Sequence, residues 1–173
     1  YSVVNRYLDR ERISNLVGQK GEEIEVEILA TFLPKKVLQS IFTVLKKVNL
    51  EVSSLTLEPI AAINAIVPLD MRRLNLVLVD IGAGTSDIAI TQGGSIIAYG
   101  MVPVAGDEIT EKLCESYLLD FLTAERIKRC LSNEEKVTFA DIFGRDYEVL
   151  SGEVIAGILP AVENLARKIA NEI

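Results

Sequence analysis

The segment LVDIGAGTSDIAI, residues 78–90, has the residue types best suited to chemistry on a phosphate. It places Asp80 at the end of one apolar run, two glycines at alternate positions, two hydroxyl residues, and Asp87 in the next apolar run. Glycines spaced in this way let backbone N–H groups approach an anion, because no Cβ stands in the way. A nucleotide phosphate also brings Mg²⁺, for which a carboxylate at the carboxyl end of a strand is a suitable ligand.

The same spacing fits an ordinary glycine-rich turn in which Asp80 only caps the backbone. The segment matches neither the G-x-x-x-x-G-K-[ST] loop nor the G-x-G-x-x-G fingerprint. Taken alone, a D-x-G-x-G segment therefore favours the plain turn, and other parts of the sequence have to decide.

Composition excludes several classes of function. With 173 residues and 49% apolar residues, the chain is long and apolar enough for one large domain or two small ones. A net charge of −7 leaves no basic surface for nucleic acid. The absence of histidine excludes Ser-His and Cys-His nucleophiles and His-ligated zinc.

Cys114 and Cys130 lie in apolar helical surroundings and are expected to be buried, reduced thiols of a cytoplasmic protein. No apolar run approaches the ~18 residues of a membrane span, so membrane attachment is expected only through flanking segments.

The N-terminal part predicts a small β-α-β unit at residues 23–58. Strict alternation predicts a half-buried strand over 24–32, and Pro34 opens a helix with apolar residues at helical spacing up to Val48. Residues 50–58 predict a second strand with a bulge at its two serines. Residues 1–22 are expected to be irregular or an edge segment.

The remaining sequence predicts an α/β fold with mixed strand directions. The expected elements are a helix at 59–67, a central strand at 74–82, a hairpin at 85–104 turning at 92–95, helices at 107–120 and 123–131, and weak strands at 139–150. A last helix follows, with Ser151 as its N-cap. Pro160 is expected to kink this helix or to move its start to a later residue. A boundary near 68–73 is expected to separate two parts, 1–73 and 74–173.

Several stretches together resemble part of the FtsA family of bacterial cell-division ATPases, which belongs with the actin and heat-shock-chaperone ATPases. Residues 78–90 resemble the family's second phosphate motif, D-[IL]-G-G-G-T-[TS]-D, and LEPIAA (57–62) resembles the segment before it. GGSIIAYGMVPVAGDEIT (93–110) resembles the downstream segment that normally ends V-G-G-D-x-[IV]-T, and AERIK (124–128) the helix that touches the adenosine. YLDRERISNLVGQKGEEIEVEI resembles the lead-in to the family's inserted β-α-β subdomain.

The resemblance implies an actin-like ATPase (ribonuclease H-like) fold fragment. Residues 1–73 would hold the inserted β-α-β subdomain and a linker helix, and residues 74–173 an incomplete nucleotide-binding lobe. The implied cofactors are ATP and Mg²⁺. Asp80 would hold the Mg²⁺ shell, and Glu58 would help position Mg²⁺ or the attacking water, although capping of the 59–67 helix explains Glu58 nearly as well.

The resemblance also implies which residues surround the nucleotide. Lining the β- and γ-phosphates would be Gly82, Ala83, Gly84, Thr85 and Ser86. Gly106 and Asp107 would open a helix near the phosphates. Glu125 and Lys128 would hydrogen-bond the ribose, although without the resemblance they read as an ordinary exposed i,i+3 ion pair. Ala83 and Ala105 replace glycines of the family motifs, so the loop is expected to hold phosphate less closely.

The implied function is an ATP-binding, actin-fold protein of cell division or filament assembly, a slow ATPase in its intact form. This chain alone is expected to be inactive, because the family's first phosphate loop and second adenosine loop fall outside it. Implied partners are further copies of the protein and the tubulin-like division protein FtsZ, in the cytoplasm or at the inner face of the cell membrane. The alternative is a non-catalytic adaptor like the pilus-assembly protein PilM, with residues 23–58 binding a partner peptide.

Overall fold

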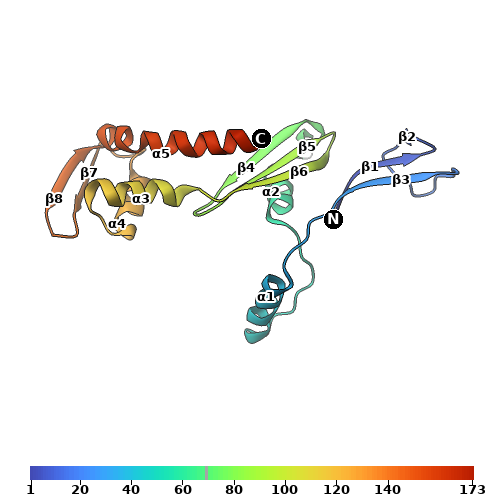
Figure 1. Ribbon diagram of the computed structural model, residues 1–173, viewed down its shortest axis with the longest axis horizontal. Coiled ribbons are helices and arrows are strands. Elements are labelled where there is room, and N and C mark those ends of the chain that lie inside the picture. Colours follow the sequence, from blue (N-terminus) through green and yellow to red (C-terminus); the bar gives the residue numbers. More distant parts are fainter. Residues whose placement is uncertain (69) are drawn as a thin grey trace. The chain divides into compact units, whose positions relative to one another are not determined.

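The glycine-rich segment lies between two strands of a three-stranded sheet (Figure 1). The sheet has the order β4-β5-β6, formed by β4 (Leu76–Ile81), β5 (Ser86–Gln92) and β6 (Ser95–Val102). The connections at 82–85 and 93–94 are too short for crossovers, so neighbouring strands run antiparallel. Gly93 and Gly94 have φ values of 57° and 85°, the left-handed conformation that a two-residue hairpin turn requires. The hairpin predicted at 92–95 is therefore confirmed.

The structure, a computed structural model, describes residues 1–68 and 70–173. These residues form two compact units, one of residues 1–78 and 89–99 and one of residues 79–88 and 100–173. Part of the predicted boundary at 68–73, residue 69, lies outside the described residues. The division of the chain into 1–73 and 74–173 stays a prediction.

A second three-stranded sheet, β2-β1-β3, belongs to the first unit. It consists of β1 (Ser2–Leu8), β2 (Glu11–Arg12) and β3 (Ile24–Leu29), all antiparallel, with Tyr7 opposite both Arg12 and Glu25. The expectation of an irregular or edge segment at 1–22 is wrong for β1, which is the central strand. Its valines and tyrosine suit a paired strand, and the polar residues among them hid this pattern.

The predicted β-α-β unit lacks its last strand. Helix α1 (Lys35–Lys47) follows Pro34, which is its N-cap, and α2 (Glu58–Ile66) has Pro59 in its first turn, both as predicted. Residues 51–57 between them are irregular, so the strand predicted at 50–58 is wrong. The apolar alternation breaks at the two serines of this segment, so neither parity gives it a continuous apolar face.

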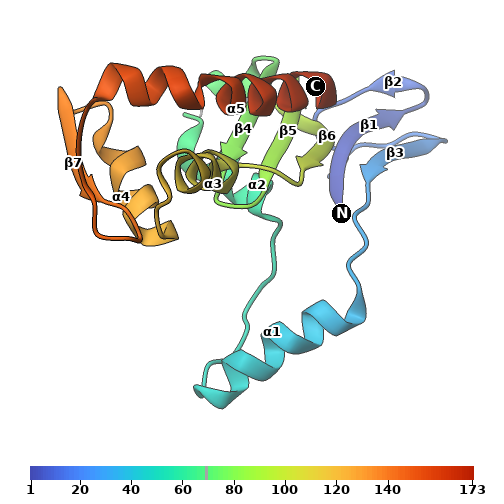
Figure 2. The ribbon, with the colours of Figure 1, turned by 60° about the vertical axis from the view of Figure 1, so that its left-hand side comes forward.

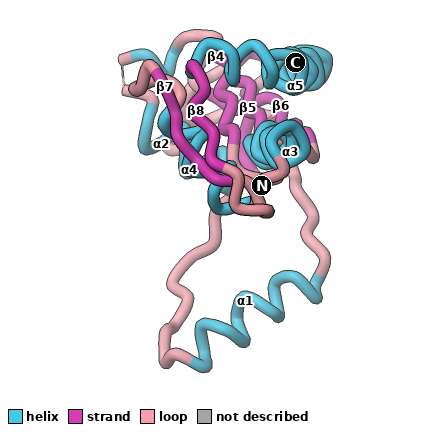
Figure 3. Tube along the Cα trace, turned by 90° about the vertical axis from the view of Figure 1, so that its left-hand side faces the viewer, coloured by secondary structure: helices cyan, strands magenta, loops and turns pink. Residues whose placement is uncertain are grey.

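Residues 24–48 bury little apolar surface. The side chains of Ile24, Val26 and Ile28 on β3 are 64%, 42% and 53% exposed, so the expected half-burial of this strand is not observed. No residue of α1 is buried, and loops join the helix to the chain on both sides (Figure 3).

The core of the first unit lies between α2 and the β4-β5-β6 sheet. Ile63 of α2 packs with Ala89 and Ile96, and further apolar side chains surround them: Leu29, Ile60, Val67, Leu78 and Tyr99.

The described residues 100–173 of the second unit form three helices and a hairpin, which can be followed in Figure 2. They are α3 (Gly106–Tyr117), α4 (Phe121–Cys130), β7 (Lys136–Ala140), β8 (Asp146–Leu150) and α5 (Ser151–Glu172). Their shared core holds Leu113, Leu119, Ala124, Ile127, Leu131, Val137, Phe139, Val154 and Ile158. Cys114 and Cys130 are free thiols, half-buried against this core rather than fully inside it. Ser151 is the first residue of α5 and not its N-cap, and the helix continues through Pro160.

This core predicts a contrast between two leucines of the second unit. Leu113→Ala removes a side chain with no exposed surface and should lower the free energy of unfolding by about 2–5 kcal/mol. Leu122→Ala is the matched control, because Leu122 is 80% exposed and surface changes usually stay within about 0.5 kcal/mol. Urea unfolding followed by circular dichroism measures both, and equal effects would contradict the assignment of this core.

Candidate functional site

The loop at 82–85 is a tight turn between β4 and β5. The N–H of Gly82 donates to the carbonyl of Thr85 at 3.0 Å, and a Cβ on Gly82 would lie 3.2 Å from that oxygen. Nothing lies within 4 Å of a Cβ built on Gly84, and Ala83 is not among the described residues with positive φ. Because its φ is negative, the backbone accommodates the methyl group of Ala83.

An exposed loop and an unpaired carboxylate lie close together in the sequence here. Residues 82–85 are exposed, and half-buried Asp80 makes no hydrogen bond or ion pair to another described residue. Thr85 donates weakly to Asp87, at 3.4 Å. Ser86 has no exposed surface, and its hydroxyl donates to the carbonyl of Val104 at 2.8 Å. The Ser86 hydroxyl is therefore already bonded inside the protein and is not available to a ligand at the exposed loop.

The first turn of α3 is bonded directly to the loop. The N–H of Gly106 donates to the carbonyl of Gly82 at 3.1 Å, and the N–H of Asp107 donates to Ala83 at 2.9 Å. These two N–H groups are free donors at most helix N-termini, where they suit an anion. Here they hold the loop instead. Ala105, the N-cap, has φ −161° and 1% exposure, so its methyl group is part of the core and causes no strain.

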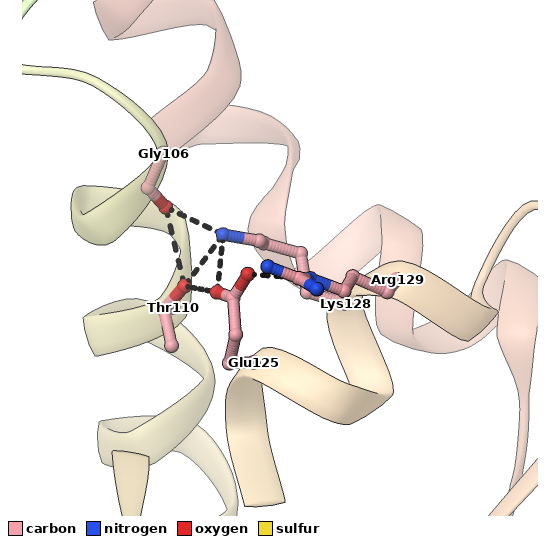
Figure 4. A network of polar contacts seen from close by, with 5 residues as sticks. All are labelled: Gly106, Thr110, Glu125, Lys128 and Arg129. Atoms are coloured by element: carbon pink, nitrogen blue, oxygen red, sulfur yellow. Dashed lines mark hydrogen bonds and ion pairs between the residues drawn. The ribbon is translucent and has the colours of Figure 1, made fainter. Parts of the chain in front are cut away.

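Glu125 and Lys128 form a half-buried network with Thr110 (Figure 4). The Thr110 hydroxyl donates to Glu125 Oε2 at 2.7 Å and accepts from Lys128 Nζ at 2.8 Å. Lys128 Nζ also lies 2.6 Å from Glu125 Oε2 and donates to the Gly106 carbonyl at 3.1 Å. Arg129 Nε, on a mostly exposed side chain, lies 2.9 Å from Glu125 Oε1. The network joins α4 to the start of α3.

Burial distinguishes this network from the ordinary exposed ion pair that the spacing alone favours. The side chains of Lys128 and Glu125 are 21% and 24% exposed, and Thr110 has no exposed surface. Hydrogen bonds from Lys128 and Thr110 lower the pKa of Glu125 to about 2. Sequence reasoning gave Thr110 no role, although it is the last residue of the 93–110 segment; its position four residues after Gly106 on one helix face was the available signal.

The structure brings most of the predicted residues into one unit. Asp80, the 82–86 segment, Gly106 and Asp107, and the Glu125–Lys128 pair all belong to the second unit. Glu58 belongs to the first unit, where it is exposed at the first position of α2 and makes no side-chain cap. Among the described residues, no group of three or more His, Cys, Asp or Glu side chains is arranged to hold a metal ion, and no helix is long and apolar enough to cross a membrane.

Residues 77–171 match the family model of the cell division protein FtsA, which covers more than half of the chain and includes the loop, α3 and α4. The chain belongs to the FtsA family. It is 30% identical over 120 residues to FtsA of Pseudomonas aeruginosa, covering 69% of this chain and 29% of that protein. To FtsA of Bacillus subtilis it is 24% identical, covering 95% of this chain and 39% of that protein. This FtsA-family chain thus spans well under half the length of these relatives.

Solved structures show that the FtsA-family chain has the actin-like ATPase fold. The ethanolamine utilization protein EutJ from Carboxydothermus hydrogenoformans is 27% identical, with a TM-score of 0.57 over 76% of this chain and 40% of EutJ. MreB5 of Spiroplasma citri bound to ADP is 23% identical, with a TM-score of 0.61 over 81% of this chain and 48% of MreB5. The PilM–PilN type IV pilus biogenesis complex matches at 19% identity, with a TM-score of 0.63 over 90% of this chain and 41% of the matched chain. The predicted fold class and family are therefore confirmed.

The low pKa of Glu125 predicts a pH-dependent contribution to stability. A carboxyl pKa lowered on folding stabilises the folded state above the ordinary pKa, and this contribution disappears as the pH falls through about 2. Glu125→Gln should therefore lower the free energy of unfolding at pH 7 by on the order of 2 kcal/mol. The difference from wild type should shrink between about pH 5 and pH 2.

Chemical denaturation of this chain at several pH values measures that difference. Glu163→Gln is the control, because Glu163 is exposed on α5 and no partner for its side chain is described. A difference between wild type and Glu125→Gln that stays constant down to pH 2 would contradict the assigned network.

Proposed function

We propose that this chain supplies part of the nucleotide site of an ATP-binding, actin-fold protein that acts in bacterial cell division or filament assembly. The observation that carries the proposal is the joined arrangement in the second unit: an exposed glycine loop beside an unpaired Asp80, bonded to the first turn of α3, which is bonded in turn to Glu125 and Lys128 of α4. The order of these parts agrees with the FtsA family, and MreB5, whose fold this chain shares, was crystallised with ADP and with AMPPNP.

The triphosphate is proposed to lie against residues 82–86. Residues 82–85 are exposed, while Ser86 would contribute only through its backbone because its hydroxyl donates to the Val104 carbonyl. Gly106 and Asp107 shape the site by holding the loop, since the loop carbonyls already take their N–H groups.

Mg²⁺ fits the residues that are present. In nucleotide sites Mg²⁺ keeps several waters and uses one or two carboxylates together with phosphate oxygens, so a single unpaired carboxylate at the end of a strand is sufficient. Asp80 would hold the hydrated ion, and the ion would neutralise charge on the phosphates. Glu58 would position the ion or the attacking water. Glu125 and Lys128 are proposed to bind the ribose.

The activity proposed for the whole protein is slow, regulatory ATP hydrolysis. Phosphoryl transfer depends on positioning and electrostatics rather than on a covalent intermediate, so a site without histidine can carry it out. The proposed partners are further copies of the protein and FtsZ, in the cytoplasm or at the inner face of the membrane.

Asp80→Ala tests the metal role in the longer protein that contains this chain. Wild-type protein should melt at a higher temperature with Mg-ATP than without it, and Asp80→Ala should lose most of that shift, because it removes a metal ligand worth several kcal/mol. Without ligand the two proteins should melt alike, since Asp80 has no described partner to leave unpaired.

Asp146→Ala is the matched control, because Asp146 is an exposed aspartate at the start of β8 in the same unit. If Asp80 only caps a turn, its replacement should lower the melting temperature and leave the Mg-ATP shift unchanged. Equal Mg-ATP shifts in wild type and Asp80→Ala would rule out the metal role.

The second candidate is a non-catalytic adaptor, and a specific observation favours it. Most apolar side chains of β3 and α1 are exposed, and the PilM–PilN structure is a complex of a protein of this fold with a partner. In this alternative, residues 23–58 bind a peptide. Calorimetry of the longer protein with ATP and Mg²⁺ separates the two: no heat of binding would favour the adaptor.

A further inference from the structure

The buried hydroxyl of Thr110 belongs to the α3–α4 network, and the proposed function gives it no role. Thr110 is the fifth residue of α3 and has no exposed surface. Its hydroxyl contacts both Glu125 and Lys128 (Figure 4). A valine of nearly the same shape would fill the same space. A hydroxyl at this position therefore needs an explanation other than packing.

Hydrogen-bond capacity shows what the hydroxyl does. It has one proton, for which two acceptors lie within reach: Glu125 Oε2 at 2.7 Å and the Gly106 carbonyl at 3.2 Å. The shorter bond to Glu125 is the better placed of the two, and the hydroxyl oxygen accepts a hydrogen bond from Lys128. The Lys128 ammonium has three protons, and its described partners are Thr110, Glu125 Oε2 and the Gly106 carbonyl. Lys128 is thus fully engaged within the protein, and its position is fixed.

Glu125 differs from Lys128, because one of its oxygens keeps a free lone pair. Oε2 accepts from Thr110 and Lys128, so both of its lone pairs are used. Within the described part of the chain, Oε1 accepts only from Arg129, whose side chain is 77% exposed. The remaining acceptor site on Oε1 suits a hydroxyl donor from a bound molecule, and the contacts on Oε2 hold the carboxylate in one orientation.

We propose that Thr110 is a positioning residue of the nucleotide site: its hydroxyl orients Glu125 so that Oε1 accepts a ribose hydroxyl, and holds Lys128 on the Gly106 carbonyl. This inference rests on the proposed function and revises one part of it: Glu125 contacts the ribose, and Lys128 supports Glu125 and the Gly106 carbonyl instead of contacting the ribose itself. Gly106 is bonded to Gly82 through its N–H and to Lys128 through its carbonyl. The Thr110 hydroxyl therefore also links the ribose contact to the phosphate loop.

Thr110→Val tests the inference, because it removes the hydroxyl and keeps the shape. Thr110→Ser is the matched control, since it keeps the hydroxyl. In this chain, nuclear magnetic resonance titration should show the pKa of Glu125 rising from about 2 toward its ordinary value in Thr110→Val and staying low in Thr110→Ser. If Thr110→Val does not fold, Thr110→Ala removes the same hydroxyl with less steric demand.

The second measurement is the preference for ribose hydroxyls in the longer protein. Calorimetry compares Mg-ATP with Mg-2′,3′-dideoxy-ATP, which lacks both hydroxyls and keeps the base and phosphates. Wild type and Thr110→Ser should prefer ATP by about tenfold, the effect of one charge-assisted hydrogen bond. Thr110→Val should lose most of this preference and keep its affinity for the dideoxy compound within a few fold.

The outcomes separate the two proposals. A wild type that binds neither nucleotide contradicts the proposed function. The positioning role of Thr110 then falls with it, because that role needs a bound ribose. A wild type that binds ATP, with unchanged Glu125 titration and ribose preference in Thr110→Val, contradicts the inference alone. Thr110→Ser behaving like Thr110→Val also contradicts it, because the hydroxyl would not be the group that matters.

Discussion

The close approach of α3 to the glycine loop is the constraint on which the rest of the site depends. A Cβ on Gly106 would lie 3.2 Å from the Gly82 carbonyl and 3.3 Å from Lys128 Nζ, tighter than side chains normally tolerate. A side chain here would push the loop carbonyl or the ammonium of α4 away by a few tenths of an ångström, so glycine suits the residue at which they meet the helix backbone. Backbone hydrogen bonds hold the loop to α3, and the half-buried side chain of Lys128 holds α4 to the same residue.

The contacts between Gly82, Gly106 and Lys128 explain why the loop can keep its geometry without every glycine of the family motif. Ala83 has a permitted φ and presents its carbonyl to Asp107, a contact that an added methyl group does not disturb. Ala105 is extended and fills the core beside Gly106. Gly82 and Gly106 lie instead where a Cβ would meet a backbone oxygen. Close contact with the backbone decides which positions need glycine.

The sequence predicted well those elements whose signal is local. The β5–β6 hairpin has a two-glycine turn, α1 follows Pro34, and α2 has Pro59 in its first turn. Helices α3 and α4 have clear helical spacing, so short-range rules were sufficient for all of these elements. The prediction failed for β1 and for residues 51–57, where pairing with distant strands decides the outcome. For the site, residue types and spacing located the loop. They could not show that the Thr110 hydroxyl bonds Glu125, or that the first N–H groups of α3 donate to carbonyls of the loop. Both contacts join segments that lie 15 or more residues apart in the sequence.

The central claim is that the loop at 82–85 and the Glu125 carboxylate are two ends of one nucleotide site, joined through Gly106. A crystal structure of the longer protein with Mg²⁺ and a non-hydrolysable ATP analogue tests it most directly. We expect the β- and γ-phosphates against residues 82–85, hydrated Mg²⁺ at Asp80, and a ribose hydroxyl on Glu125 Oε1, with the Gly106–Gly82 bond intact. A nucleotide bound elsewhere, or phosphates held by the loop with the ribose remote from Glu125, would contradict the account.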